Sequence, residues 1–355
     1  MARSFRNPLL SRSFQRALGA MTRTAVRAGS KAMAQALQVT PVPARARRAK
    51  TLLSRPRPAR PKAAPKLTDA TTGWSRSTTV GAMGYRLYKP PGVLRSERLP
   101  ILVMLHGCSQ DAEALAVSSR MNQIAARERF LVLYPMQERF ANLQGCWNWY
   151  DTRAGRAQRE ADALGAMIER VCRSQPVDPA RIALAGLSAG ASMAALMAVR
   201  QPERYRAIVM HSGIAPGIAH SSATALGAMR GRRAAVPLEP LTPGQHLPPL
   251  LVIQGTADPI VAAGNGAEAA GLWAAREGAV AGAQRTVQRG KRYAATVTDY
   301  RAGGRLVATL CLIQGLGHAW SGGAPGVGYS DPKGPDASRM IWTYASRQFA
   351  GTRRA

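Results

Sequence analysis

The chain has 355 residues, of which 46% are hydrophobic, so it can bury one substantial core and carry an appendage. Its formal net charge is +30, and the charge is uneven: 16 of the 49 basic residues precede Asp69, which is the first of the 19 acidic residues. No apolar run approaches the about 20 residues of a transmembrane helix, and the four cysteines show neither CxxC nor Cys/His spacing. We therefore expect neither a membrane span nor a zinc site.

Residues 1–68 are predicted to form a basic arm and linker that precede a globular domain at residues 69–355. Residues 1–38 mix arginine with apolar side chains at loosely helical spacing, and the proline- and arginine-rich residues 39–67 predict an extended linker. No uninterrupted apolar segment follows the first arginines, so we favour a cytoplasmic or granule-associated location over an extracellular one. The arm is either a solvated tail or a segment that binds an anionic surface such as phospholipid, nucleic acid or a granule.

The globular domain is predicted to open with an antiparallel hairpin, whose strands are Ser75–Val80 and Tyr85–Lys89. The strands predicted after it are Ile101–Leu105, Phe130–Tyr134, Arg181–Leu187, Ala207–His211, Leu250–Gln254 and Arg305–Gln314, and the predicted helices are Arg159–Arg173, Ala189–Arg200 and Ala337–Phe349. Strands separated by helices indicate βαβ units, so we expect an α/β fold with a mainly parallel sheet and helices on both faces. Residues 214–248 are rich in Gly, Pro and Arg and are expected to form an irregular insertion near the site.

A serine lies between a predicted strand and a predicted helix, in Gly186-Leu187-Ser188-Ala189-Gly190. A strained turn at this place lifts the Ser188 hydroxyl clear of the sheet edge, and the flanking glycines allow the backbone to approach closely. The helix N-terminus behind the serine supplies N–H groups for a developing oxyanion. A serine that only caps a helix is the simpler alternative, but the strand before it and the helix after it favour a nucleophile.

A nucleophilic serine needs a base and a carboxylate that orients the base, and in this type of site their chain order is Ser, then Asp or Glu, then His. Asp258 follows a buried-looking strand, and His318 is the one histidine downstream of it. We therefore predict Ser188, Asp258 and His318 as a catalytic triad. The alternatives are a turn-forming aspartate before Pro259 and a surface-loop histidine. His211 ends a strand and is expected to be a buried histidine with satisfied hydrogen bonds.

The loop that follows the strand Ile101–Leu105 begins with His106-Gly107-Cys108. A loop after an early strand supplies the second oxyanion donor, so the backbone N–H groups of Cys108 and Ala189 are the expected oxyanion hole. His106 is expected to hold the loop in place by hydrogen bonds.

Aromatic side chains gather beside the predicted site in a chain that is only 6% aromatic. Trp147 and Trp149 lie in one loop and Trp320 follows the predicted base, so these three are candidates for a substrate-binding wall, with core packing as the alternative. Cys108 and Cys146 lie in loops near the site, and we predict that they pair in an oxidising compartment, the alternative being two free thiols. The other two cysteines, at positions 172 and 311, are predicted core residues.

Four motifs carry a family resemblance: Leu105-His106-Gly107-Cys108, Gly145-Cys146-Trp147-Asn148-Trp149, Gly186-Leu187-Ser188-Ala189-Gly190 and Gly317-His318-Ala319-Trp320. Together, over about residues 75–350, the chain resembles the poly(3-hydroxybutyrate) depolymerase family of esterases, which is related to the acetyl xylan and feruloyl esterases. The resemblance implies an α/β-hydrolase fold, the same triad, and the Cys108 amide in the oxyanion hole.

The implied reaction is hydrolysis of a carboxylic ester through an acyl-enzyme on Ser188, without a metal or organic cofactor. Poly(3-hydroxybutyrate) or its oligomers are the expected substrates. Two alternatives stay open: an acetyl xylan or feruloyl type of polysaccharide esterase, and a granule- or nucleic-acid-binding protein whose hydrolase domain is vestigial. The oligomeric state is left open.

Overall fold

The computed structural model describes residues 74, 78–80, 83–234, 236–238, 242 and 244–350. The predicted basic arm, residues 1–68, lies outside this part of the chain. Eleven strands of the described residues form one sheet, in the order β1-β2-β4-β3-β5-β6-β7-β11-β10-β8, with β9 paired to β10. These strands are β1 Thr78–Val80, β2 Met83–Tyr88, β3 Leu99–Leu105, β4 Leu131–Met136, β5 Val177–Leu187, β6 Ala207–His211, β7 Leu250–Gly255, β8 Val280–Ala281, β9 Arg285–Val287, β10 Ala295–Ala302 and β11 Arg305–Ile313. Two short strands, β12 Trp320–Ser321 and β13 Ser330–Asp331, form a second, parallel pair.

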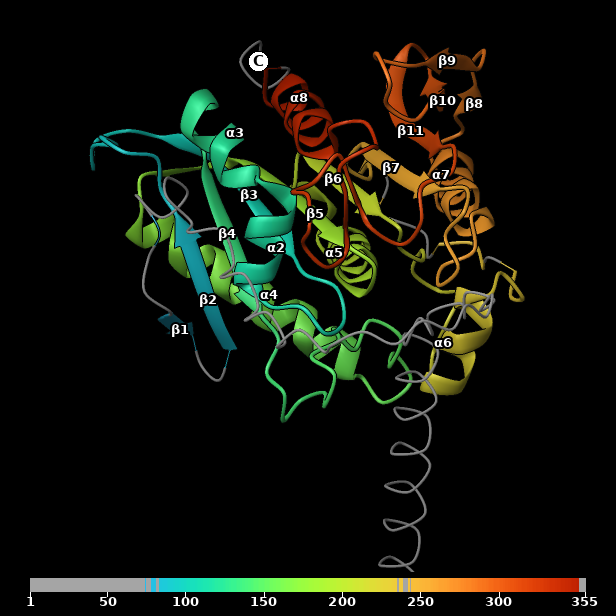
Figure 1. The fold of residues 1–355 in the computed structure, drawn as a ribbon. Coiled ribbons are helices and arrows are strands. Elements are labelled where there is room, and N and C mark those ends of the chain that lie inside the picture. Colours follow the sequence, from blue (N-terminus) through green and yellow to red (C-terminus); the bar gives the residue numbers. More distant parts are fainter. Residues whose placement is uncertain are drawn as a thin grey trace, which may run out of the picture.

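The centre of the large sheet is parallel and its two edges are antiparallel. Strands β4, β3, β5, β6, β7 and β11 pair with their neighbours in parallel, whereas β2 runs antiparallel to β4, and β10 runs antiparallel to β11. The predicted hairpin is confirmed, because β1 and β2 pair antiparallel. The loops that follow all six parallel strands therefore emerge at one edge of the sheet (Figure 1).

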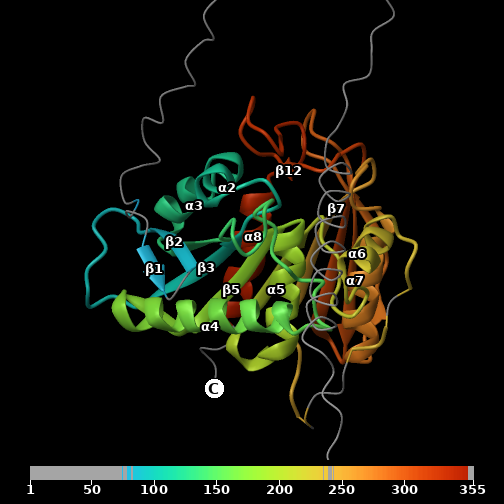
Figure 2. The same ribbon diagram turned by 90° about the horizontal axis from the view of Figure 1, so that it is seen from below.

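Helices cover both faces of the sheet, as predicted. The helices are α2 Ala112–Ser119, α3 Met121–Glu128, α4 Arg156–Ser174, α5 Ala189–Arg200, the short 3-10 helix Pro202–Arg204, α6 Ser222–Met229, α7 Gly264–Arg276 and α8 Ala337–Ala350. Helices α2, α3 and α8 pack into one apolar cluster, and α4, α5 and α7 pack into the other. Figures 1 and 2 show α2 and α3 on the side of the sheet opposite to α4 and α5. Because both faces are covered, the central strands are apolar along most of their length: β6 and β7 are buried at every position.

The structure corrects the expectation that residues 214–248 are irregular. Helix α6 lies inside this segment, and it begins with a capping box in which Ser221 and Thr224 bond to each other's backbone N–H groups. Helices α2, α3 and α7 also lie where no helix was predicted. Among the described residues, no helix is long and apolar enough to cross a membrane.

Candidate active site

Ser188 occupies the turn between β5 and α5, with φ 56° and ψ −120°. This is a conformation that a side-chain-bearing residue adopts only when its surroundings hold it there, at a cost of about 1–3 kcal/mol. A Cβ atom on Gly186 would lie 2.3 Å from the carbonyl carbon of Gly190, and one on Gly190 would lie 2.1 Å from the carbonyl oxygen of Leu105, so glycine is required at both positions. The Ser188 N–H donates to the His211 carbonyl at 2.9 Å, which ties the turn to β6.

Asp258 and His318 form a buried pair at the same edge of the sheet, after β7 and β11. The Nδ1 atom of His318 lies 2.8 Å from Oδ2 of Asp258. The other carboxylate oxygen accepts the N–H groups of Ile260 and Val261, both at 2.9 Å. Burial raises the pKa of Asp258, but the bonds from His318 and from the two backbone amides outweigh it, so the pKa lies below its ordinary value. An ionised Asp258 keeps the proton of His318 on Nδ1 and leaves Nε2 to accept another.

A buried amide that sequence reasoning missed supports this aspartate. Gln254, near the end of β7, is fully buried, and its Nε2 donates to Asp258 Oδ2 at 3.3 Å and to the Val261 carbonyl at 3.0 Å. Its one signal in the sequence was an amide at the end of an otherwise apolar strand.

His106 holds the loop after β3, as predicted. Its Nδ1–H donates to the Gly107 carbonyl at 2.9 Å, and its Nε2 accepts the Gln137 N–H at 3.1 Å. Burial lowers the pKa of His106, which keeps the accepting nitrogen unprotonated. The imidazole therefore links the end of β3 to the segment that follows β4 through two hydrogen bonds.

The loop after β3 is attached at two adjacent points to residues 144–150, which we call the aromatic loop. Cys108 and Cys146 form a disulfide, with a Cα–Cα distance of 4.2 Å, and the Ser109 N–H donates to the Gln144 carbonyl at 2.8 Å. Cys108 and Ala189, the two residues whose amides were expected in the oxyanion hole, both line the pocket that contains the serine. The other two cysteines, Cys172 and Cys311, are free thiols, half-buried and buried respectively.

A buried carboxylate holds the aromatic loop in place by hydrogen bonds. Glu160, on α4, accepts the Asn148 N–H and the Gln137 side-chain amide, each at 2.8 Å, and it also accepts the Asn148 side-chain amide. The Gln137 amide also donates to the Cys146 carbonyl at 3.1 Å. Sequence reasoning missed Glu160, because nothing in its helical surroundings distinguishes it from a solvated acid.

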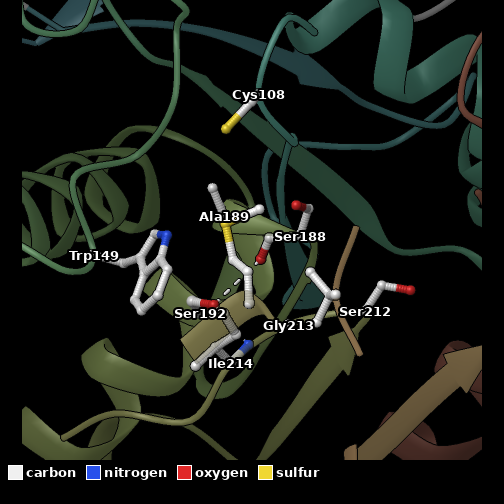
Figure 3. A pocket seen from close by; sticks show the side chains of 10 residues that line it. Cys108, Trp149, Ser188, Ala189, Ser192, Ser212, Gly213 and Ile214 are labelled. Atoms are coloured by element: carbon white, nitrogen blue, oxygen red, sulfur yellow. Dashed lines mark hydrogen bonds between the residues drawn. The ribbon is translucent and has the colours of Figure 1, made fainter. Parts of the chain in front are cut away.

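The pocket over Ser188 is narrow and largely apolar. Trp149, one of the three candidates for the substrate wall, lines it together with Ile214, Met229 and Val261. Figure 3 shows the Trp149 ring on one side of the serine, and Ser212 on the other. Ile214 and Met229 belong to the segment that was predicted to be inserted near the site.

Two of the three tryptophans expected on the substrate wall lie elsewhere, which corrects that prediction. Trp147 is fully buried, and its indole N–H donates to the His106 carbonyl at 3.0 Å. Trp320 is also fully buried, and it stacks on His211 and donates to the Ser338 hydroxyl at 3.1 Å. Both rings fill the scaffold, because a large flat side chain with a satisfied N–H packs well in a core. In the part of the chain that the structure describes, no group of three or more His, Cys, Asp or Glu side chains is arranged to hold a metal ion.

A parallel sheet covered on both faces, a serine at a strand-to-helix turn, and an acid and a histidine after later strands define the α/β-hydrolase fold. The solved structure of an acetyl xylan esterase from Aspergillus awamori matches this fold with a TM-score of 0.56, over 68% of this chain and 93% of that chain. The two sequences are 18% identical, so this likeness shows the fold alone.

The sequence pattern of the esterase PHB depolymerase family matches residues 83–289, and the chain belongs to this family. Poly(3-hydroxyalkanoate) depolymerase C of Paucimonas lemoignei is 35% identical over 105 residues, which are 29% of this chain and 25% of that protein. Feruloyl esterase B of Neurospora crassa is 27% identical over 146 residues, which are 41% of this chain and 48% of that protein. The matches thus span a quarter to about half of the length of these relatives. The family resemblance found in the sequence motifs is confirmed.

Proposed function

We propose that this protein is a serine carboxylic-ester hydrolase with Ser188, Asp258 and His318 as its catalytic triad. One observation carries the proposal: the buried 2.8 Å bond between His318 and Asp258 lies at the same sheet edge as the strained serine turn. Membership of an esterase family supports the reaction class. A structural serine would need neither a strained turn nor an oriented histidine at that edge.

The first step forms an acyl-enzyme. His318 Nε2 takes the hydroxyl proton as Ser188 Oγ attacks the ester carbonyl carbon, and the N–H groups of Cys108 and Ala189 donate to the oxyanion. Asp258 stabilises the imidazolium that forms. When the tetrahedral intermediate collapses, the ester C–O bond breaks and the leaving alcohol takes the proton from His318.

The second step releases the acid. His318 takes a proton from a water molecule, whose oxygen attacks the acyl carbon, and the same amides hold the second oxyanion. Collapse breaks the bond to Ser188 Oγ, which recovers its proton from the imidazolium. The cycle consumes one water molecule and needs no metal or organic cofactor.

For the substrate, we propose poly(3-hydroxybutyrate) or its oligomers. The stretch of 35% identity to a poly(3-hydroxyalkanoate) depolymerase supports this choice, and a narrow apolar pocket fits a short aliphatic acyl unit. An acetyl xylan or feruloyl type of activity is the second candidate, favoured by the feruloyl esterase relative. A granule- or nucleic-acid-binding protein with a vestigial hydrolase domain is the third.

Substitution of the serine tests the reaction. Ser188→Ala should lower the hydrolysis of p-nitrophenyl butyrate by roughly 10⁴-fold or more, because it removes the nucleophile. The thermal unfolding midpoint should change little, since the substitution removes one oxygen atom and no packed apolar group. A fluorophosphonate should label the wild-type chain at Ser188. Ser346→Ala is a matched control, because that hydroxyl bonds to the Thr343 carbonyl within α8. A Ser188→Ala protein that keeps most of its activity would refute the triad.

A substrate panel then separates the candidates. Hydrolysis of 3-hydroxybutyrate trimers at the highest kcat/KM supports the depolymerase. A preference for acetylated xylan or for feruloyl esters supports the polysaccharide esterase. Absence of turnover on all of these esters, in a folded protein that fluorophosphonate does not label, supports the vestigial domain.

A further inference from the structure

A second histidine lies between the serine turn and the loop that carries His318. His211 ends β6 and is fully buried. In the sheet it pairs with Leu187 of β5 on one side and Ile253 of β7 on the other. Its carbonyl oxygen accepts the Ser188 N–H at 2.9 Å. The backbone of His211 is thus in direct contact with the residue proposed as nucleophile.

The side chain of the same residue reaches the opposite half of the site. Its Nε2 accepts the N–H of Ser321, three residues after His318, at 3.1 Å. Its Nδ1–H donates to the Ser212 hydroxyl at 3.1 Å, and its ring stacks on Trp320 with centroids 5.3 Å apart. Both ring nitrogens and one ring face are therefore engaged.

The bond to Ser321 requires a neutral imidazole, because a protonated Nε2 cannot accept a hydrogen bond. Burial, and to a lesser extent nearby His318, lowers the pKa of His211 to about 3 against the opposing effect of Asp258. His211 therefore stays neutral when His318 gains its proton during the reaction.

We infer that His211 is a positioning residue, which links the Ser188 turn to the loop of His318 and so fixes the distance between nucleophile and base. The inference rests on the proposed triad. The loop depends on this bond because Ser321 is buried and its N–H donates to the imidazole rather than to a backbone carbonyl. A residue that only filled core space would use the shape of its ring and not its nitrogens.

Three substitutions separate positioning from packing. His211→Phe keeps the ring and its stacking on Trp320 but removes both nitrogens. His211→Asn keeps an amide near Ser212 but is too short to reach Ser321, whereas His211→Gln places an amide oxygen near the position of Nε2. His246→Gln is the control, because His246 is an exposed histidine paired with Glu277.

Two readouts are needed, kcat and KM on a soluble ester, and hydrogen exchange of the Ser321 amide in the full chain. For the Phe and Asn variants we expect kcat to fall by about 10- to 100-fold while KM stays within about twofold, because a small displacement of a catalytic group is costly. We expect the Ser321 amide to exchange at least about tenfold faster in both, since its acceptor is gone. The Gln variant should recover most of both quantities, and the control should match the wild type.

Each other outcome is decisive. If kcat and amide exchange in the Phe and Asn variants equal those of the wild type, His211 is a packing residue and the inference fails. It also fails if exchange accelerates while kcat is unchanged. If the Phe variant does not fold, the comparison of Asn with Gln carries the test. If the wild type hydrolyses no ester but the Ser321 amide exchanges faster in the Phe and Asn variants than in the wild type, the proposed reaction is wrong and the link through His211 stands.

Discussion

Two buried histidines beside the site work as neutral acceptors. The Nε2 atoms of His106 and His211 accept the backbone N–H groups of Gln137 and Ser321. Burial lowers the pKa of both imidazoles, that of His211 to about 3. The same residue type thus has opposite roles within one site: two histidines that must not take a proton, and the proposed base His318, which must.

These lowered pKa values predict a loss of stability in mild acid. Below the ordinary histidine pKa of about 6.5, the unfolded chain binds protons on the two imidazoles that the folded chain excludes. The free energy of unfolding should therefore fall as the pH drops below about 6.5. The part of this loss that is due to His211 should continue until the pH reaches its folded pKa of about 3. His211→Gln does not titrate, so urea unfolding at pH 7 and pH 5 should show a smaller loss in this variant. Equal losses in variant and wild type would contradict the assignment.

At the level of elements, the site depends on how two loops are fastened together. The disulfide joins Cys108 and Cys146 across a sequence separation of 38, and the Ser109–Gln144 hydrogen bond lies beside it. Cys108 is also a proposed oxyanion donor. The same disulfide thus stabilises the fold and fixes the position of the Cys108 amide, which is proposed to stabilise the oxyanion.

Removing the bridge should therefore affect stability and rate together. We expect Cys146→Ser to lower the free energy of unfolding by roughly 2–4 kcal/mol, because the unfolded chain regains freedom in the closed loop. We expect kcat to fall by up to about 10²-fold, because a displaced amide stabilises the oxyanion poorly. Urea unfolding and ester kinetics measure the two effects.

Cys172→Ser is the control, because Cys172 is a free, half-buried thiol. Peptide mapping without reductant checks the bridge itself. Two alkylatable thiols at positions 108 and 146 after aerobic purification would contradict the bridge.

The six parallel strands, the opening hairpin and the candidate triad could be predicted from sequence because their signals are local, whereas β8, β9, β10, β12 and β13 were not predicted. An apolar run bounded by a turn marks a buried strand, and the order of serine, acid and histidine left a single histidine to choose. Helices α2 and α3 were not found, because they are short and are joined by Arg120, a left-handed residue that is not glycine. The burial of Trp147 and Trp320 could not be predicted either, because it depends on partners such as the His106 carbonyl and Ser338, far away along the chain.

At the level of the whole molecule, about half of the net positive charge precedes every proposed catalytic group. Residues 1–68 hold 16 basic side chains and no acidic one, whereas the proposed catalytic groups all lie at or beyond Cys108. The arm lies outside the described residues, so its role stays a prediction. Each charge near an anionic surface contributes about 1 kcal/mol, and salt screens it.

A chain that starts at Asp69 should keep its kcat and KM on a soluble ester. It should lose salt-sensitive binding to anionic vesicles, nucleic acid or polymer granules, as measured by co-sedimentation in low and high salt. Loss of turnover on truncation would place part of the arm in the catalytic domain. Unchanged binding would identify the arm as a solvated tail.

The order of strands in the sheet also sets when the protein can first act. Ser188 follows β5, but His318 follows β11, which must add to the free side of β7 before the imidazole can reach the site. A nascent chain that has emerged only as far as β7 therefore carries the proposed nucleophile without the proposed base. If the proposed triad is right, the nascent chain should hydrolyse no ester until β11 is in place, and unfinished copies should be inactive.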